Sequence, residues 1–535
     1  MISARQPWLM HYDEGVPQQL EYPDFCIHDL LSNQSERTPQ KTAIVIGDRS
    51  ILYADLDRLT NNFARNLISH GIKRGDVVGI CLANSIEFVI SFFAVLKAGA
   101  IVAAMNPVFP SSELNFQVET SCATVIITSN SNVQDFKSEG IRGRKIKLIL
   151  VGDPINKQYS HYEDFLCELD TDIVLPEVNP SEPAVIQFSG GTTGVPKAAL
   201  GSHQNLVANV TQFRHWLVNL EDGNETFLLA IPLYHVYGLV LGLILGIGMG
   251  GRIIFTEKQG NVTEILELFR KYPISYFPAV PSLFNMINQH PGVMNGDYSL
   301  ATVKACISGS APLMESVRLE FEKNTCGFLV EGYGLSEAPT ATHCNPILGE
   351  KRSGSIGLPL PDVDCRITSL TEDGLEVTQG EEGELWVQGP QIMLGYLNEV
   401  IETKKTMQDG WLRTGDIARM DSDGYFYLSG RIKELIKVHG MQVWPNEVES
   451  VVSRHPSVLE CAVAGVPDQI RGEGVKAWVV LKPGHSLGLE ELRTFCLDYL
   501  VGYKIPTELE ILEILPKTPV GKILRRVLVE EHNSQ

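Results

Sequence analysis

Hydrophobic positions in the first half of the chain follow two spacings that alternate along the sequence. Apolar residues recur about every 3.6 positions at 56–68 and at 86–96, which predicts helices. Short continuous apolar runs at 77–82 and 124–128 predict buried strands between and after them. The same order returns between residues 207 and 277. Alternation of strands and helices is typical of α/β layers with largely parallel sheets.

The pattern changes near residue 350. Short strands at 365–368 and 383–389 are separated by acidic, glycine-rich turns, which indicates a small β subdomain at about 350–430. Beyond Arg431, a helix opened by Pro445, two strands and another helix indicate a separate α+β domain of normal independent size. We therefore predict an α/β fold with a large N-terminal domain over 1–430 and a small C-terminal α+β domain over 434–535.

Charge narrows the function classes. The 535 residues are 44 % apolar and 20 % charged, with a formal net charge of −20. This composition excludes disorder, collagen and coiled coil as the main organisation. The negative charge disfavours nucleic-acid partners, because phosphate backbones are repelled. The segment from Arg431 onward has nearly balanced charges, and its cations suit an encounter with phosphates.

Cysteine spacing and hydrophobic run lengths indicate the compartment. None of the ten cysteines forms a C-x-x-C pair, so we expect reduced core cysteines in a cytoplasmic protein, with neither a zinc site nor a disulfide framework. The N-terminus lacks the apolar core of a signal peptide. The longest apolar run, Val236–Gly251, is shorter than the ~20 residues of a membrane span. We expect no transmembrane segment and leave peripheral membrane contact and oligomeric state open.

The strongest chemical signal is SGGTTGVPK, directly after the apolar run 184–188. Its glycines free the backbone to wrap a ligand closely, its hydroxyls donate hydrogen bonds, and its lysine adds a cation. Val195-Pro196 separates the last glycine from the lysine, so the spacing differs from a kinase-type P-loop. The motif predicts an oligophosphate cradle formed by Ser189, Gly190, Gly191, Thr192, Thr193, Gly194 and Lys197.

A second glycine pattern does not predict dinucleotide binding. Gly246, Gly248 and Gly251 satisfy G-x-G-x-x-G, but they follow a helical run and precede a strand. Gly238, Gly242, Gly246 and Gly250 recur at a spacing of four, which places them on one helix face. Such a face serves either close packing or the wall of an acyl tunnel, and both interpretations stay open.

Two further motifs carry candidate ligand groups. GYGLSE at 332–337 predicts a close-approach loop with a tyrosine suited to stacking on a purine. Its Glu337 is a carboxylate of the kind that holds Mg²⁺. In GWLRTGD at 410–416, Asp416 is an acceptor for ribose hydroxyls, and Arg431 can donate to ribose or phosphate.

These motifs, with GRIKELIKVHG and the terminal PVGK, match in order and spacing the adenylate-forming superfamily of acyl- and aryl-CoA synthetases, peptide-synthetase adenylation domains and luciferases. The resemblance covers nearly the whole chain. Within the superfamily the sequence most resembles fatty-acyl-CoA synthetases, through PWLMHYDEGVP near the start, NPVFPSSEL at 106–114 and NLVANVTQF at 205–213.

The resemblance implies a role for each matching residue. The phosphate loop and Lys197 would bind ATP phosphates, Tyr333 would stack on adenine, and Glu337 would ligate Mg²⁺. Ser336 stands where the family more often has threonine and keeps the hydroxyl. The remaining nucleotide contacts would come from Gly309, Ser310, Ala311, Gly332, Gly334, Asp416, Arg431 and the adenylation lysine, Lys522.

The resemblance also implies an acyl site and a moving domain. The acyl group would lie against His235, Tyr237, Gly242 and Gly334. A hinge at 431–433, centred on Lys433, would let the C-terminal domain act as a lid that rotates between two half-reactions. In the second orientation it would present Lys437, Gly440 and Met441 for the CoA step.

We therefore expect an enzyme, an ATP-dependent ligase that uses ATP, Mg²⁺ and CoA to convert a carboxylic acid into its thioester through acyl-AMP. A medium- or long-chain fatty acid is the first expectation for the substrate. The alternatives are an aryl acid of the 4-coumarate type, transfer to a carrier protein, a light-emitting oxygenase, and a nucleotide-binding scaffold without catalysis.

Overall fold

The computed structural model describes residues 6–136, 145–153, 158–170, 172–188, 196–372, 374–468, 470–518 and 523–533. The chain divides into two compact units. The first comprises Met1–Ser189, Pro196–Asp364 and Gln388–Leu412, and the second comprises Cys365–Val387 and Arg413–Gln535. This division differs from the boundary expected at 431–433, because the strands of the β subdomain group with the C-terminal segment. The hinge itself stays a prediction.

The largest sheet of the first unit has, among the described residues, the strand order β18-β9-β8-β4-β3-β5-β6-β7. Its strands β7, β6, β5, β3, β4 and β8 run parallel, and β9 and β18 continue it in antiparallel pairing, as expected for an α/β layer. The bounds are β3 (Val77–Cys81), β4 (Ile101–Ala104), β5 (Val125–Ser129), β6 (Lys147–Val151), β7 (Ser160–His161), β8 (Pro183–Phe188), β9 (Ala198–Ser202) and β18 (Gly395–Tyr396).

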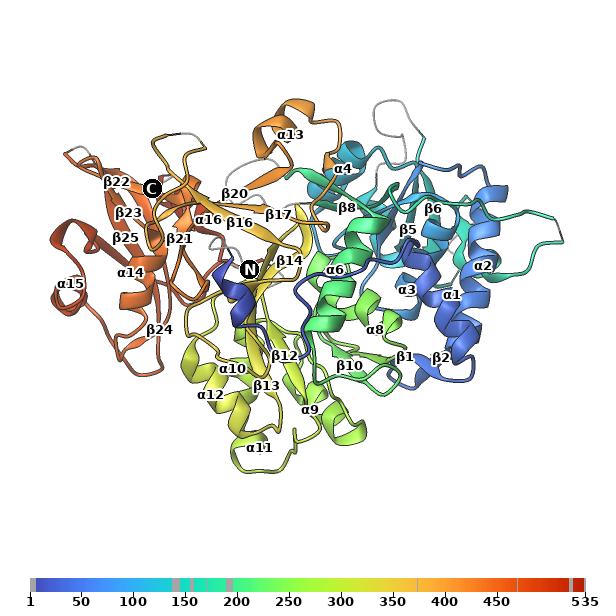
Figure 1. The fold of residues 1–535 in the computed structure, drawn as a ribbon, viewed down its shortest axis with the longest axis horizontal. Helices are drawn as coiled ribbons and strands as arrows, with labels where there is room; N and C mark the ends of the chain where they lie inside the picture. Colours follow the sequence, from blue (N-terminus) through green and yellow to red (C-terminus); the bar gives the residue numbers. More distant parts are fainter. Residues whose placement is uncertain are drawn as a thin grey trace. The chain divides into compact units, whose positions relative to one another are not determined.

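Three helices near the N-terminus pack against one another and lie side by side in Figure 1: α1 (Ile27–Arg37), α2 (Tyr53–Ser69) and α3 (Ile86–Lys97). Every residue of α3 from Ile86 to Lys97 except Glu87 is buried, which explains why its sequence is apolar all round. The Ser85 hydroxyl caps this helix by accepting a hydrogen bond from the Phe88 backbone N–H.

Two smaller sheets complete the first unit. One has the order β10-β11-β1-β2 and the other the order β12-β13-β14-β15. Tyr276, which the sequence placed in a strand, forms isolated bridges to Phe227 and Ala305 between them. The bounds are β1 (Thr42–Ile46), β2 (Arg49–Leu52), β10 (Thr226–Leu229), β11 (Arg252–Phe255), β12 (Ala305–Ser308), β13 (Phe328–Leu335), β14 (Ala338–Cys344) and β15 (Leu358–Pro359).

The other helices of this unit are short or peripheral, apart from α6, which follows β9 and packs on β14. None of the helices in the described parts of the chain has the length and apolar character needed to cross a membrane. Their bounds are α4 (Ser111–Ser121), α5 (Tyr162–Leu166), α6 (His203–Trp216), α9 (Val262–Lys271), α10 (Pro281–Asn288), α11 (Pro291–Met294), α12 (Glu315–Lys323) and α13 (Val400–Thr406).

The glycine-rich run folds as α7 (Val236–Gly238), a π-helical segment (Leu239–Ile244) and α8 (Leu245–Gly248). Two of its glycines, Gly242 and Gly246, pack on β10 and β11. A Cβ at Gly242 would lie 2.8 Å from the Leu229 methyl carbons, and a Cβ at Gly246 would lie 2.9 Å from Ile253. These contacts support the packing interpretation, and the assignment of Gly242 to the acyl site stays a prediction.

The second unit contains two antiparallel-rich sheets. One pairs β16, β17, β20 and β21, and the other has the order β23-β22-β25-β24, with β26 joined to β25. Helix α16 packs on β24, and apolar residues of the second sheet and of α14 and α15 form the core. The bounds are β16 (Asp364–Thr368), β17 (Gly383–Gln388), β20 (Trp411–Met420), β21 (Phe426–Arg431), β22 (Ile436–Val438), β23 (Met441–Val443), α14 (Pro445–Val452), β24 (Val458–Asp468), β25 (Gly472–Leu481), α15 (Leu489–Leu497), β26 (Glu508–Ile511) and α16 (Arg525–Asn533).

Candidate functional site

The phosphate loop was expected between β8 and β9, and only its last residues are described. Ser189, Gly190, Gly191, Thr192, Thr193 and Gly194 lie outside the described residues, as does Lys522. Lys197 is described and stands immediately before β9.

Lys197 begins a chain of polar contacts in the first unit. Its Nζ lies 2.7 Å from Oε2 of Glu402 in α13 and 4.9 Å from the ring centroid of Tyr396 in β18. Glu402 also accepts a hydrogen bond from Lys405 at 2.7 Å. The hydrogen bonds from these two lysines, Lys197 first, lower the pKa of Glu402 to about 2. The Glu402 carboxylate is therefore ionised, and it forms an ion pair with the Lys197 ammonium.

Tyr396 connects this pair to the expected magnesium ligand. Its hydroxyl donates a 2.7 Å hydrogen bond to Oε1 of Glu337. The Glu337 backbone carbonyl accepts from the Met393 N–H at 2.9 Å, which ties the residue to the segment before β18. Burial, and then the neighbouring Glu337 carboxylate, raise the pKa of Tyr396. The tyrosine is therefore a neutral donor that orients Glu337.

The donor set around Glu337 fits a hard divalent cation. Its half-buried carboxylate supplies oxygen, and Mg²⁺ prefers one or two carboxylates together with phosphate oxygens and water. Tyr396 and Glu402 were not among the residues singled out from the sequence. Neither belongs to a glycine-rich motif, so no local signal marked them.

Tyr333 stands in a β-hairpin, not in the loop that its glycine neighbours suggested. It pairs in register with His343 across β13 and β14, with ring centroids 5.8 Å apart. A Cβ at Gly334 would lie 1.7 Å from the Thr340 carbonyl oxygen, so the glycine is required by the close approach of β14 rather than by a free loop. Burial lowers the pKa of His343 to about 3, which keeps that ring neutral behind Tyr333. The hairpin thus sets the position of the Tyr333 ring.

Tyr237, one of the expected acyl residues, packs against the loop that follows β12, and His235 stands beside it. His235 caps α7, since its Nδ1 accepts from the Tyr237 N–H at 3.2 Å. The Tyr237 hydroxyl donates to the Ile307 carbonyl at 2.7 Å and its ring lies against Gly309, where a Cβ would be 3.3 Å away. Ser310 follows with a left-handed φ of 72°. The structure therefore brings His235, Tyr237, Gly309 and Ser310 together, with Ala311 next in the chain.

Glu331 anchors this loop, although nothing in the sequence marked it. Glu331 in β13 accepts a hydrogen bond from the Leu313 N–H at 3.1 Å. Burial raises its pKa to about 8. It also stands next to Gly332, so it links the β12 loop to the strand that carries Tyr333.

The second unit carries the expected ribose pair. Asp416 in β20 and Arg431 in β21 are register partners, and the Arg431 Nε lies 2.7 Å from Oδ1 of Asp416. The Asp416 side chain is buried, while about a third of Arg431 is exposed. Arg431 thus orients the carboxylate, and its exposed side can meet a ligand.

The residues expected at the hinge and the CoA step follow β21. Lys433 lies in the short 3-10 helix Ile432–Glu434. Lys437, Gly440 and Met441 lie on the β22–β23 hairpin, whose turn has left-handed φ values at His439 and Gly440. The Met441 side chain is exposed, so the hairpin offers an apolar group to solvent.

Comparison with known proteins identifies the family of this chain. The family model "AMP-binding enzyme" matches residues 31–397, and "AMP-binding enzyme C-terminal domain" matches residues 447–522. A long-chain-fatty-acid–CoA ligase of Bacillus subtilis is 37 % identical over 99 % of each chain. The 4-coumarate–CoA ligase CCL1 of Humulus lupulus is 30 % identical over 96 % of this chain and 94 % of that protein.

Among solved structures, the Bacillus subtilis O-succinylbenzoate coenzyme A synthetase in complex with ATP and magnesium ion matches with a TM-score of 0.80. The two sequences are 25 % identical, over 93 % of this chain and 98 % of that one. The chain therefore belongs to the AMP-binding enzyme family of the adenylate-forming superfamily, and it is an AMP-forming acyl-CoA ligase.

Proposed function

We propose that this ligase activates a medium- or long-chain fatty acid as acyl-AMP, with release of pyrophosphate, and then transfers the acyl group to CoA. The observation that carries the choice of acid is the full-length similarity, at 37 % identity, to a protein named long-chain-fatty-acid–CoA ligase.

In the first half-reaction the acid attacks the α-phosphate of ATP, and negative charge builds on the transferring and leaving phosphates. Lys197 and the loop 189–194 would stabilise that charge. Because Lys197 is paired with Glu402, it would exchange this carboxylate for a phosphate when ATP binds. Glu337, oriented by Tyr396, would hold Mg²⁺, which neutralises phosphate charge when bound.

Residues of several motifs would position the nucleotide. Tyr333 would stack on adenine, with Gly332, Gly334 and the loop Gly309–Ala311 close to it, and the Ser336 hydroxyl would contact the α-phosphate. Asp416 would accept hydrogen bonds from ribose hydroxyls while Arg431 holds its carboxylate in place. Lys522 would contact the substrate carboxylate and the α-phosphate during adenylation only.

The second half-reaction needs a different set of groups, because a thiolate then attacks the mixed anhydride. Rotation at Lys433 would withdraw Lys522 and present Lys437, Gly440 and Met441. His235 and Tyr237 would border the acyl group in both stages, and the Tyr237 contact with the β12 loop supports this place for them.

An aryl acid remains the second candidate, supported by the 30 % identity to a 4-coumarate–CoA ligase. A panel of C4–C18 fatty acids and phenylpropenoic acids, each with ATP, Mg²⁺ and CoA, separates the two. We expect the highest kcat/KM for a fatty acid of medium or long chain. A preference for phenylpropenoic acids would contradict the proposal, and transfer to a carrier protein but not to CoA would contradict the acceptor.

The role of Lys522 is tested by separating the half-reactions. We expect Lys522→Ala to abolish acyl-AMP formation, while thioester formation from supplied acyl-AMP stays nearly intact. An equal loss of both half-reactions would contradict this assignment. A wild-type chain that fails to exchange pyrophosphate with any acid would favour the scaffold alternative.

A further inference from the structure

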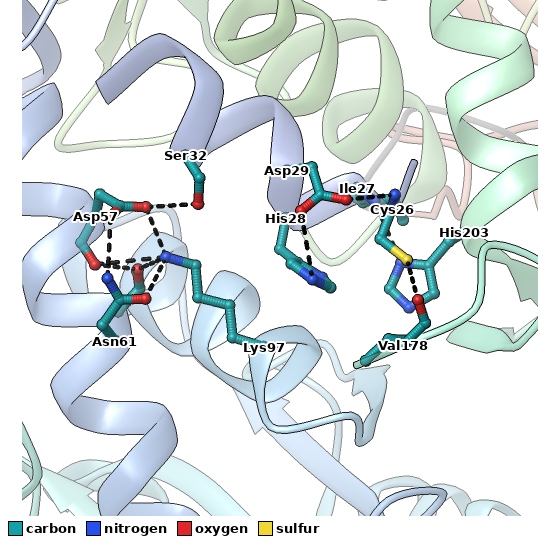
Figure 2. A network of polar contacts seen from close by, with 11 residues as sticks. Cys26, Ile27, His28, Asp29, Ser32, Asp57, Asn61, Lys97, Val178 and His203 are labelled. Atoms are coloured by element: carbon teal, nitrogen blue, oxygen red, sulfur yellow. Dashed lines mark hydrogen bonds and ion pairs between the residues drawn. The ribbon is translucent and has the colours of Figure 1, made fainter. Parts of the chain in front are cut away.

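Three metal-binding side chains that have no part in the proposed reaction meet in the first unit. Cys26 is the N-cap of α1, His28 is the second residue of that helix, and His203 is the first residue of α6. One ligand atom from each lies within 4.8 Å of the other two. Figure 2 shows the three side chains gathered where the two helices begin. The sequence spacing gave no metal motif, because His203 is distant in the chain.

One ligand atom of this cluster has no partner among the described residues. The Cys26 thiol donates to the Val178 carbonyl at 3.3 Å, and His203 Nδ1 accepts from the Ile27 N–H at 3.3 Å. His28 Nδ1 is buried and has no hydrogen-bond partner. This unpartnered nitrogen differs from the saturated bonding usual in protein interiors.

A carboxylate lies beside the cluster. One Asp29 oxygen is 3.8 Å from His28 Nε2, and the other accepts a hydrogen bond from the Cys26 N–H at 2.7 Å. This negative charge favours a cation nearby. A metal ion binds thiolate and neutral imidazole, so it would displace the Cys26 thiol proton.

We propose that Cys26, His28 and His203 form a binding site for a borderline divalent cation of the Zn²⁺ class. One thiolate and two imidazoles suit zinc, which takes three protein ligands and a water in a tetrahedral arrangement. Zinc–ligand bonds of about 2.0–2.3 Å require the three atoms to approach by roughly 1 Å, which side-chain rotation supplies. His203 Nδ1 would give up its 3.3 Å bond to Ile27.

Charge and access are consistent with this site. The start of α1 has the positive end of the helix dipole, which opposes a cation, but the thiolate and Asp29 offset it. The His28 side chain is 14 % exposed, so it offers the ion a way in. The bound ion would clamp α1 to the strand–helix junction that follows Lys197 and would have no part in acyl transfer.

The test is a Co²⁺ titration of the full-length protein, freed of metal by a chelator and kept without ATP. We expect tetrahedral Co²⁺ bands and a thiolate-to-cobalt charge-transfer band that saturate at one equivalent, with both displaced by Zn²⁺. Cobalt at an oxygen-only site such as Glu337 gives no sulfur band, so the two sites are distinguishable. Zn²⁺ should also raise the Tm of the wild type.

Variants decide which residues are ligands. Cys26→Ser should lose the charge-transfer band, and His28→Gln should weaken Co²⁺ affinity by about 10-fold or more. Cys326→Ser, at an exposed cysteine, is the matched control and should keep the band. Circular dichroism checks that each variant folds. The proposal is overturned by a wild type without the band, by a band that survives in Cys26→Ser, or by unchanged affinity in His28→Gln.

Discussion

Two lysines of the first unit carry the same charge and have opposite surroundings. Lys97, at the end of α3, is buried, and its ammonium donates to Asp57 at 2.6 Å, Asn61 at 2.7 Å and Thr60 at 2.8 Å (Figure 2). Lys197 is about a third exposed and meets one carboxylate and the face of a tyrosine ring.

The surroundings of the two lysines indicate that Lys97 stabilises the fold, whereas Lys197 can exchange its carboxylate partner for another anion. The three donor hydrogens of Lys97 are matched by three acceptors, so nothing is left to bind a ligand. Burial lowers its pKa, and the Asp57 carboxylate opposes that shift. Lys197 can trade its partner for a phosphate at small cost, because an exposed pair is weak. On the proposed function, burial and hydrogen bonding, rather than residue type, separate the structural lysine from the one that would bind phosphate.

The largest expected effect is on stability, at the buried lysine Lys97. Lys97→Met leaves the Asp57 carboxylate without its cation, and the free energy of unfolding should fall by about 3–5 kcal/mol. Urea unfolding measures the change, with Lys323→Met, at an exposed lysine, as the control. A loss below about 1 kcal/mol would mean that the Lys97–Asp57 pair stabilises the fold no more than an exposed ion pair does.

Lys197→Met should have the reverse profile. We expect acyl-AMP formation to fall by about 100-fold or more, because a charge contact to the reacting phosphates is lost. The Tm should change little. Pyrophosphate exchange measures the first quantity and a melting curve the second. A large fall in Tm, with equal losses of acyl-AMP formation and thioester formation, would mean that Lys197 stabilises the fold as Lys97 does.

Glu331 sharpens the comparison as an acidic side chain that burial keeps protonated and that accepts a hydrogen bond from a backbone N–H. Its pKa is raised to about 8 in the folded state, so between pH 4.5 and 8 the folded protein keeps a proton that the unfolded chain has lost. The stability contributed by this group is therefore full at low pH and declines as pH rises toward 8. The decline should reach about 2 kcal/mol between pH 5.5 and 7.

Urea unfolding of wild type and Glu331→Gln at both pH values tests this prediction. The glutamine does not titrate, so the stability difference between the two proteins should shift by that amount. Glu315→Gln, at an exposed position at the start of α12, should show no such shift. A constant difference across the pH range would mean that Glu331 is ionised in the folded protein.

The smallest expected effect concerns the partner of Lys197. Glu402→Gln removes the carboxylate that competes with phosphate, so the KM for ATP should fall by about 2- to 5-fold. Glu399→Gln, at an exposed position just before the same helix, is the control and should leave the KM for ATP unchanged. A higher KM for ATP in Glu402→Gln would show that Glu402 assists Lys197 instead of occupying it.

The sequence alone determined the α/β class, the order of the motifs and the residue types expected at the nucleotide. Local patterns suffice for these features, because apolar spacing sets helices and strands and glycine sets close approaches. The helices near 56–68 and 86–96 and the strand near 77–82 lie where spacing placed them. The family models confirm the class of enzyme.

Only the tertiary structure decided how the candidate site is held. Tyr396 and Glu337 are 59 residues apart, and Glu402 and Lys197 are 205 apart, so no local pattern joins them. The Gly332–Tyr333 segment looked like a loop because glycines are flexible, yet pairing with β14 makes it a strand. Gly242 was ambiguous because a small residue accommodates either a ligand or a neighbour. The structure places Leu229 of β10 against it, which favours the neighbour, since close packing depends on which surfaces the fold brings into contact.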